Sequence, residues 1–140
     1  MNGTVTLYVK EYVDDSSITH IDIEQVGLAG IRGSTELRSL DWQERQRSDN
    51  VFGEVLGKSR WIAVRDVEDA YLREGWGEEM NRAGAMVMES NVKSVGNGWT
   101  AVQIWGFEQV DGDRRYSRHV VVTKEDQRIE ARLIYDFQKR

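Results

Sequence analysis

Two dipeptides in the C-terminal half of this 140-residue chain, Asn97-Gly98 and Asp111-Gly112, are typical of tight turns between antiparallel strands. The chain contains no proline, so glycine and Asx residues mark its turns. Around these dipeptides, polar and apolar residues alternate with the period of two that indicates β-strands. We expect these strands at about 85–95, 99–110, 113–123 and 128–137. The half is therefore predicted to be an antiparallel meander.

The turns fix which residues face each other across the expected strands. The Asp111-Gly112 turn gives three pairs: Trp105 with Arg118, Phe107 with Tyr116, and Gln103 with Val120. A turn at 124–127 adds two more: Arg118 with Leu133, and Tyr116 with Tyr135. A two-residue turn at Asn97-Gly98 adds Ser90 with Trp105, and Met88 with Phe107.

All three registers place one set of mostly apolar side chains on the same face of the meander. This expected inner face carries Met86, Met88, Val92, Trp99, Ala101, Trp105, Phe107, Tyr116, Val120, Val122, Ile129, Ala131, Leu133, Tyr135 and Phe137. The expected outer face carries Glu89, Lys93, Glu108, Arg115, His119, Glu130, Arg132 and Asp136. A slip of one residue would exchange the two sets, so the pattern strongly favours these registers.

The N-terminal half also has strand patterns, which we expect at about 4–13, 18–26, 34–42 and 51–65, the last bent or broken at Gly57-Lys58. The polar stretch 43–50 is expected to be an exposed loop. The one helical signal covers 66–80, with Asp66 as its cap and Gly75 as a stop, and it suggests a lid or plug. These elements predict an all-β protein: a closed antiparallel up-and-down barrel of about eight to ten strands in a single domain, residues 1–140.

Composition excludes several classes of function. The chain has no cysteine, which excludes disulfides, thiolate nucleophiles and cysteine-bound metal centres. Its net charge is −5 and its basic residues are scattered, so nucleic acid is not an expected partner. No apolar run approaches the roughly 18 residues of a membrane span, and we expect a cytoplasmic protein without a membrane partner. No glycine-rich phosphate loop leads into a helix, and no cofactor is expected.

Polar side chains interrupt the apolar face of the meander and predict a ligand site. Arg118, Gln103 and Ser90 lie there among Trp99, Trp105, Tyr116, Tyr135, Met88 and Phe107. One interpretation is that Arg118 binds an anionic or carbonyl group of a ligand held between the aromatic rings. The alternative is a structural role, in which Arg118 pairs with a carboxylate of the N-terminal half or reaches water at the barrel mouth.

A second candidate site is the alternating trio His20, Asp22 and Glu24, whose side chains share one face of a strand. If the preceding loop spans 14–17, Asp22 faces Val9 and His20 faces Glu11, and the trio lies inside. There it could transfer protons, with Arg118 and Arg38 as counter-charges. If the loop also includes residue 18, Asp22 faces Lys10 and Glu24 faces Tyr8, and the trio lies outside. Both registers stay open, and the pattern is too weak to predict a metal site.

The expected architecture, many antiparallel strands with one short helix and a mixed polar and aromatic interior, resembles the calycin group of lipocalin-like barrels. The run His20-Ile21-Asp22-Ile23-Glu24-Gln25, the triplet Leu40-Asp41-Trp42 and the segment from Gly98-Trp99 to Phe107 are similar to small lipocalin-like proteins of filamentous fungi. The early G-x-W motif of lipocalins is absent. The resemblance implies a barrel with an interior ligand, and some small cofactor-free barrels encoded with natural-product genes act as isomerases or cyclases.

These observations lead to one functional hypothesis with two alternatives. We expect a cofactor-free isomerase or cyclase that acts on an apolar, partly aromatic small metabolite inside the barrel. Glu24, Asp22, His20 and Arg118 are its expected catalytic residues. The first alternative is a carrier or sensor that binds the same molecule without changing it; the second is an interaction module whose aromatic face is only core. A homodimer is left open.

Overall fold

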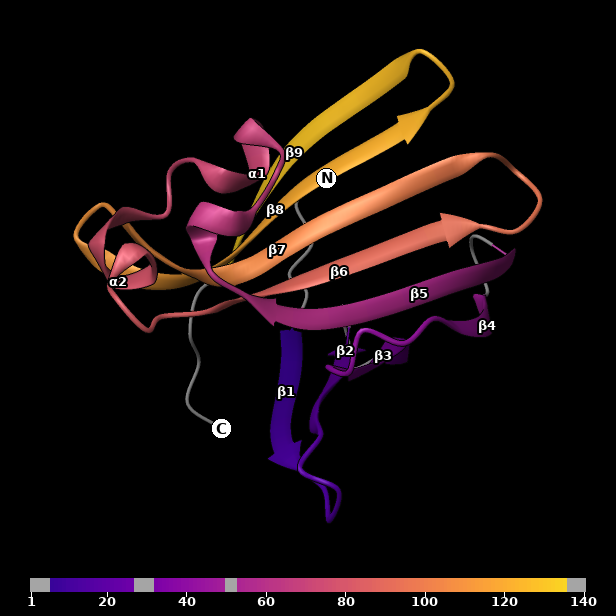
Figure 1. Ribbon diagram of the computed structural model, residues 1–140, viewed down its shortest axis with the longest axis horizontal. Helices are drawn as coiled ribbons and strands as arrows, with labels where there is room; N and C mark the ends of the chain where they lie inside the picture. Colours follow the sequence, from indigo (N-terminus) through magenta and orange to yellow (C-terminus); the bar gives the residue numbers. More distant parts are fainter. Residues whose placement is uncertain (1–5, 27–31, 50–52, 136–140) are drawn as a thin grey trace.

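The computed structural model describes residues 6–26, 32–49 and 53–135. Its strands form two antiparallel sheets (Figure 1). The first contains β1 (Thr6–Val13), β2 (Thr19–Val26) and β3 (Arg32–Ser39). The second contains, in chain order, β4 (Arg45–Asp49), β5 (Gly53–Ile62), β6 (Val87–Ser94), β7 (Trp99–Val110), β8 (Asp113–Lys124) and β9 (Gln127–Tyr135). The prediction of an all-β, antiparallel protein is confirmed.

The pairings among the described residues do not form a closed ring. No ladder joins β9 to β1 or β3 to β4 within 6–26, 32–49 and 53–135. Closure of a barrel therefore stays a prediction, as does the single domain. Residues 136 and 137, which the sequence placed on the two faces of the last strand, lie outside the described residues.

The register of the meander is confirmed at two of its three turns. Trp105 pairs with Arg118, and Arg118 pairs with Leu133, as expected. Asp111 and Gly112 have φ values of +52° and +85°, the left-handed pair that a two-residue hairpin with the natural strand twist requires.

The register between β6 and β7 differs from the prediction by two residues. Met88 pairs with Trp105, and Ser90 pairs with Gln103. The loop spans residues 95–98, and the Asn97 N–H donates to the Ser94 hydroxyl at 2.8 Å. The predicted two-residue turn at Asn97-Gly98 is therefore wrong. A shift of two keeps every side chain on its expected face.

Three predictions for the region 43–80 are wrong. The expected loop 43–50 contains β4, an edge strand that pairs only with β5 in the described part of the chain. Edge strands often carry charged residues without an apolar pattern, so the alternation that indicates a strand is missing there. The strand β5 is continuous through Gly57, because β4 and β6 pair with it on both sides.

The expected helix 66–80 is three short pieces: the 3₁₀ helix η2 (Val64–Asp66), α1 (Ala70–Arg73) and α2 (Gly77–Asn81). The N-terminal cap of α1 is Asp69, whose carboxylate accepts the N–H groups of residues 71 and 72. Gly75, with φ at +89°, separates α1 from α2. In the part of the chain that the structure describes, no helix is long and apolar enough to cross a membrane.

The six-stranded sheet is covered on both faces. On one face, Ile21 and Ile23 of β2 pack against Met88 and Trp105. On the other face, the larger core forms under η2, α1 and α2, which together we call the helical segment. Figure 1 shows α1 and α2 lying over β7 and β8. This second core contains Ile62, Val64, Val67, Leu72, Trp76, Met80, Val87, Ile104 and Val121. The helical segment thus lies on the face that was expected to be outside.

His119 shows the consequence of this cover. Its side chain is fully buried, so the prediction that it lies on an outer face is wrong. The ring stacks on Trp76 with 3.8 Å between centroids, and Nε2–H donates to the Glu108 carboxylate at 2.8 Å. Burial lowers the pKa of His119, although the bond to Glu108 acts in the opposite direction.

We predict that Gly106→Ala destabilises the fold. An added Cβ would lie 3.0 Å from Trp76 and Val87 and 3.2 Å from the Met80 sulfur. Overpacking of this kind costs about 1–3 kcal/mol of unfolding free energy, measurable by urea denaturation. The matched control is Gly96→Ala, whose Cβ meets nothing within 4 Å. Equal stability of the two variants would contradict the close packing of the helical segment.

We also predict a pH dependence that comes from His119. Because its folded-state pKa lies below the unfolded value of about 6.5, the unfolded chain takes up the proton first as pH falls. The contribution of His119 to the unfolding free energy is therefore complete above pH ~6.5 and decreases as the pH falls below this value. Denaturation at several pH values should show this decrease, and His119→Gln should reduce it while His20→Gln keeps it. If the unfolding free energy of His119→Gln decreases with falling pH as much as that of the wild-type protein, the neutral, buried ring of His119 is not the source of the decrease.

Candidate functional site

Arg118 of β8 lies at the centre of the candidate site, between the two sheets. Its side chain is 5% exposed, which excludes the alternative that it reaches water. The guanidinium carbon lies 3.8 Å from the centre of the Trp105 ring, and Nε–H donates to the Tyr116 hydroxyl at 2.9 Å. The ring contact and the hydrogen bond together hold the cation in one orientation.

The rings around Arg118 contact one another edge to face. Trp105 and Tyr116 lie 6.4 Å apart at an interplanar angle of 73°, and Phe107 meets Tyr116 at 6.0 Å. Tyr135 of β9 approaches Tyr116 to 5.2 Å, and its ring centre lies 5.7 Å from the Arg118 guanidinium. Strand pairing produces this cluster, because Tyr116 pairs with both Phe107 and Tyr135.

Most of the other predicted binding residues border this cluster. The Trp105 Nε1–H donates to Gln103 Oε1 at 2.8 Å, which orients both side chains. Met88 and Ser90 are buried beside them on β6. Trp99 does not join the cluster: it lies six residues from Trp105 on β7, or about 20 Å along an extended strand.

Arg38 reaches the cluster from the other sheet. It pairs with Ile21 in the β2–β3 ladder, so its side chain points to the same side as this core residue. It is buried, and its guanidinium lies 5.7 Å from the Trp105 ring. Two arginines, one from each sheet, thus flank the same indole.

The trio His20, Asp22 and Glu24 lies outside this cluster. The second of the two open registers holds, since Asp22 pairs with Lys10 and Glu24 pairs with Tyr8. Ile21 and Ile23 face the core instead, and alternation turns the trio away. The condition for proton transfer inside the protein, burial of the trio, is therefore not met.

His20 has a partner in the loop before its strand. Its Nε2 lies 2.7 Å from the Asp14 carboxylate, and its Nδ1 lies 3.0 Å from the Ser39 hydroxyl. The bond from His20 holds the pKa of Asp14 below its ordinary value. These contacts connect the loop after β1 with the end of β3. Within the described residues, no group of three or more His, Asp or Glu side chains is arranged to bind a metal ion.

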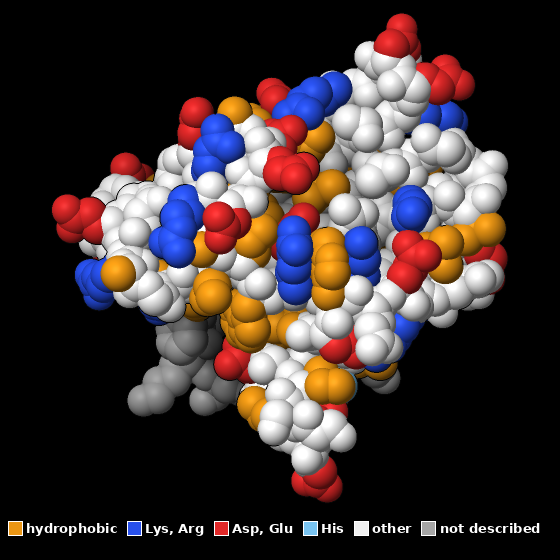
Figure 2. Space-filling model, in the orientation of Figure 1, with side chains coloured by type: hydrophobic (Ala, Val, Ile, Leu, Met, Phe, Trp, Pro, Cys, Tyr) orange, Lys and Arg blue, Asp and Glu red, His pale blue; other side chains and the backbone are white. Residues whose placement is uncertain are grey.

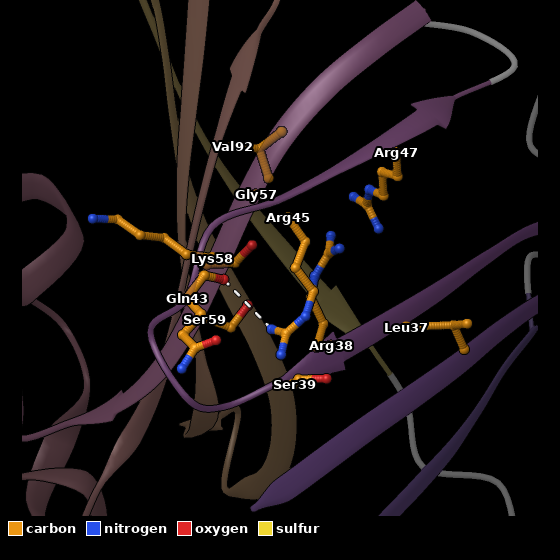
Figure 3. Close-up of a pocket in the computed structure, with 11 residues that line it drawn as sticks. Leu37, Arg38, Ser39, Gln43, Arg45, Arg47, Gly57, Lys58, Ser59 and Val92 are labelled. Atoms are coloured by element: carbon orange, nitrogen blue, oxygen red, sulfur yellow. Dashed lines mark hydrogen bonds between the residues drawn. The ribbon is translucent and has the colours of Figure 1, made fainter.

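A small cavity opens beside Arg38, between β3 and the sheet formed by β4, β5 and β6 (Figure 3). Its volume is about 50 Å³, and none of its eleven lining residues is acidic. They are Leu37, Arg38, Ser39, Gln43, Arg45, Arg47, Gly57, Lys58, Ser59, Ser90 and Val92. Sequence reasoning did not find Arg45 or Arg47 as site residues, because the residues of β4 were expected to form a loop. It also missed Ser59, although that residue lies on an expected strand. The alternation of arginines in Arg45-Gln46-Arg47 was the available signal.

A larger cavity of about 360 Å³ lies on the opposite face, under the helical segment. Four of its charged residues form two ion pairs: Arg60 with Glu89 at 2.8 Å, and Arg128 with Asp69 at 2.8 Å. Figure 2 shows acidic and basic side chains interspersed on the side that carries the helical segment. The pair of Arg128 with Asp69 connects β9 to the N-terminus of α1, while Arg60 and Glu89 join β5 to β6. We give this cavity no catalytic role.

The fold and the inner site define a class: a small antiparallel β protein with a buried aromatic and cationic site between two sheets. The chain is 29% identical over 124 residues to the "probable pericyclase scpY" of Mollisia scopiformis, covering 87% of this chain and 64% of that protein. It is 25% identical over 138 residues to the "pericyclase pydY" of an Acremonium species, covering 96% of this chain and 72% of that protein. The chain thus spans slightly less than two thirds of the length of the first relative. No family model matches the chain, and no solved structure matches it.

Proposed function

We propose that the chain is a cofactor-independent cyclase of the pericyclase type, acting on an apolar, unsaturated small metabolite bound between the two sheets. The names of its relatives support this class of reaction. A role in natural-product biosynthesis is part of the proposal. The proposal includes the closure of the two sheets into a lipocalin-like barrel around the ligand.

The chemistry of a pericyclic reaction fits the residues at the inner site. Bonds form and break together in one cyclic array of electrons, so no proton is transferred and no group leaves. A protein accelerates such a reaction by folding the substrate into the reactive shape and by stabilising charge that develops on its substituents. The outward-facing trio His20, Asp22 and Glu24 is then not required.

Arg118 is the observation on which the proposal rests. Its guanidinium is buried, fixed by the Tyr116 hydroxyl and stacked on Trp105. A carbonyl oxygen that accepts a hydrogen bond from this cation would draw electrons from the attached alkene and make it more reactive toward a diene. The low dielectric of the site strengthens such a bond.

The aromatic rings would control the shape of the bound substrate. Trp105, Tyr116 and Tyr135 present rigid faces around one cation. On the same inner side of the sheet, Leu133 of β9 is 42% exposed, so apolar surface is available next to them. A polyene packed on these surfaces would keep one folded conformation, which favours one stereoisomer of the product.

We predict that Arg118→Gln lowers turnover about a hundredfold or more while weakening binding only slightly. Arg118→Lys keeps the charge but loses the planar fork, and should lie between wild type and Arg118→Gln. The substrate for this test is a synthetic linear polyene with a carbonyl-activated alkene that cyclises slowly on its own. Chromatography gives the rate and the isomer ratio, and tryptophan fluorescence gives the binding.

The matched control is Arg132→Gln, which removes the same charge from the opposite face of β9 and should retain turnover. A wild-type protein that binds the polyene without changing its rate or isomer ratio would contradict the proposal and indicate a carrier. Loss of turnover in Glu24→Gln with full turnover in Arg118→Gln would instead assign the reaction to the carboxylate.

A further inference from the structure

The small cavity beside Arg38 has the charge of an anion-binding site. Its lining contains the basic residues Arg38, Arg45, Arg47 and Lys58 and no carboxylate. Arg45 donates to the Asp41 carboxylate, and this bond lowers the pKa of Asp41 to about 2. Lys58 extends toward Trp42, with its Nζ 4.1 Å from the ring centre. Arg38 and Arg47 line the cavity together with these two residues.

Two buried polar atoms of the cavity lack hydrogen-bond partners among the described residues. One is the hydroxyl of Ser90, a residue with 0% exposure, and the other is Nε of Arg47. Buried polar groups in native proteins almost always have a partner, because leaving them without one is costly. Both residues line the cavity, so a ligand there that accepts hydrogen bonds is a candidate partner for these atoms.

The size of the cavity limits this ligand to a small group. About 50 Å³ corresponds to roughly three or four water-sized probes. A carboxylate or an enolate oxygen with its neighbouring atoms fits this volume, and a whole metabolite does not. Arginine binds carboxylates with two parallel hydrogen bonds, which suits a planar acidic group.

The cavity adjoins the aromatic site. Ser90 pairs with Gln103, and Gln103 accepts the hydrogen bond of the Trp105 indole. Arg38 borders both places, since it lines the cavity and lies 5.7 Å from the Trp105 ring. Figure 3 shows the side chains of Arg38, Arg45 and Arg47 reaching into the space between β3 and β4. One molecule could therefore occupy the cavity with its polar end and the aromatic site with its body.

We propose that this cavity binds the acidic head group, a carboxylate or an enolate, of the substrate whose apolar body lies on Trp105 and Arg118. This inference rests on the proposed function and specifies its substrate class as an acid-bearing polyene. Ser90 donates its hydroxyl to the head group, and Arg38 and Arg47 neutralise its charge. Binding the acid at this end fixes which part of the polyene lies against Arg118.

The test compares two fluorescent probes that differ only at the head group: trans-parinaric acid, a conjugated tetraene with a carboxylate, and its methyl ester. We expect the wild-type protein to bind the acid roughly ten- to a hundredfold more tightly than the ester, because charge-assisted hydrogen bonds are lost in the ester. Probe fluorescence measures both affinities at neutral pH.

Three variants locate the head group. Arg47→Gln should reduce the preference for the acid to a few-fold without changing ester affinity. Ser90→Ala removes a buried hydroxyl without a described partner, so it should reduce the preference while the melting temperature stays equal or rises. The control Arg60→Gln removes one positive charge from the opposite face, where Arg60 is bonded to Glu89, and should keep the preference.

The outcomes separate this inference from the proposed function. Equal affinity of the wild-type protein for acid and ester would overturn the head-group site and leave the aromatic site intact. Loss of the preference in Arg60→Gln alone would assign the acid to the larger cavity and also overturn it. Failure of both probes to bind would count against the proposed function itself.

Discussion

The pairing of β7 with β8 is the constraint on which the site depends. It holds Trp105 opposite Arg118 and Phe107 opposite Tyr116, and it sets which side chains of the sheet face β2 and which face the helical segment. Because side chains alternate along a strand, a slip of one residue would bury the wrong set on both faces. The cation, the indole and the tyrosine ring are neighbours only in this register.

Each face of the six-stranded sheet carries a buried cluster, but the two clusters differ in composition. On the helical side, Gly106 allows Trp76 and Met80 to pack against the sheet, and His119 is buried as a partner of Trp76 and Glu108. This core stabilises the sheet. On the other side, Arg118 and Gln103 contact the Trp105 indole, and a small cavity without acidic lining residues opens beside Arg38. We infer from this asymmetry that the inner side is the one that binds a ligand.

At two of the three turns of the meander the local sequence predicted the long-range pairing, whereas at Asn97-Gly98 the predicted register was wrong by two residues. The Asp111-Gly112 turn predicted the partners of Arg118, and alternation predicted its aromatic neighbours. The prediction was wrong where tertiary contacts determine whether a side chain is buried. The charges around His119 suggested solvent, because nothing local indicates that Trp76 stacks on it. The position of Arg47 was missed because an edge strand has no apolar pattern. The face on which His20 lies depends on the length of the loop after β1, and a difference of one residue in that loop exchanges the two faces.

The central claim, that the ligand binds between the sheets at Trp105, can be tested through two indole N–H groups with different partners. The indole N–H of Trp105 donates to the side chain of Gln103 between the sheets. The indole N–H of Trp76 donates to the backbone carbonyl of Leu72 in the helical segment. Their signals in ¹H–¹⁵N spectra can be assigned with Trp→Phe variants and followed during titration with trans-parinaric acid. The account predicts a saturable shift of the Trp105 signal and an unchanged Trp76 signal. A shift of Trp76 with Trp105 unchanged would place the ligand on the other face and contradict it.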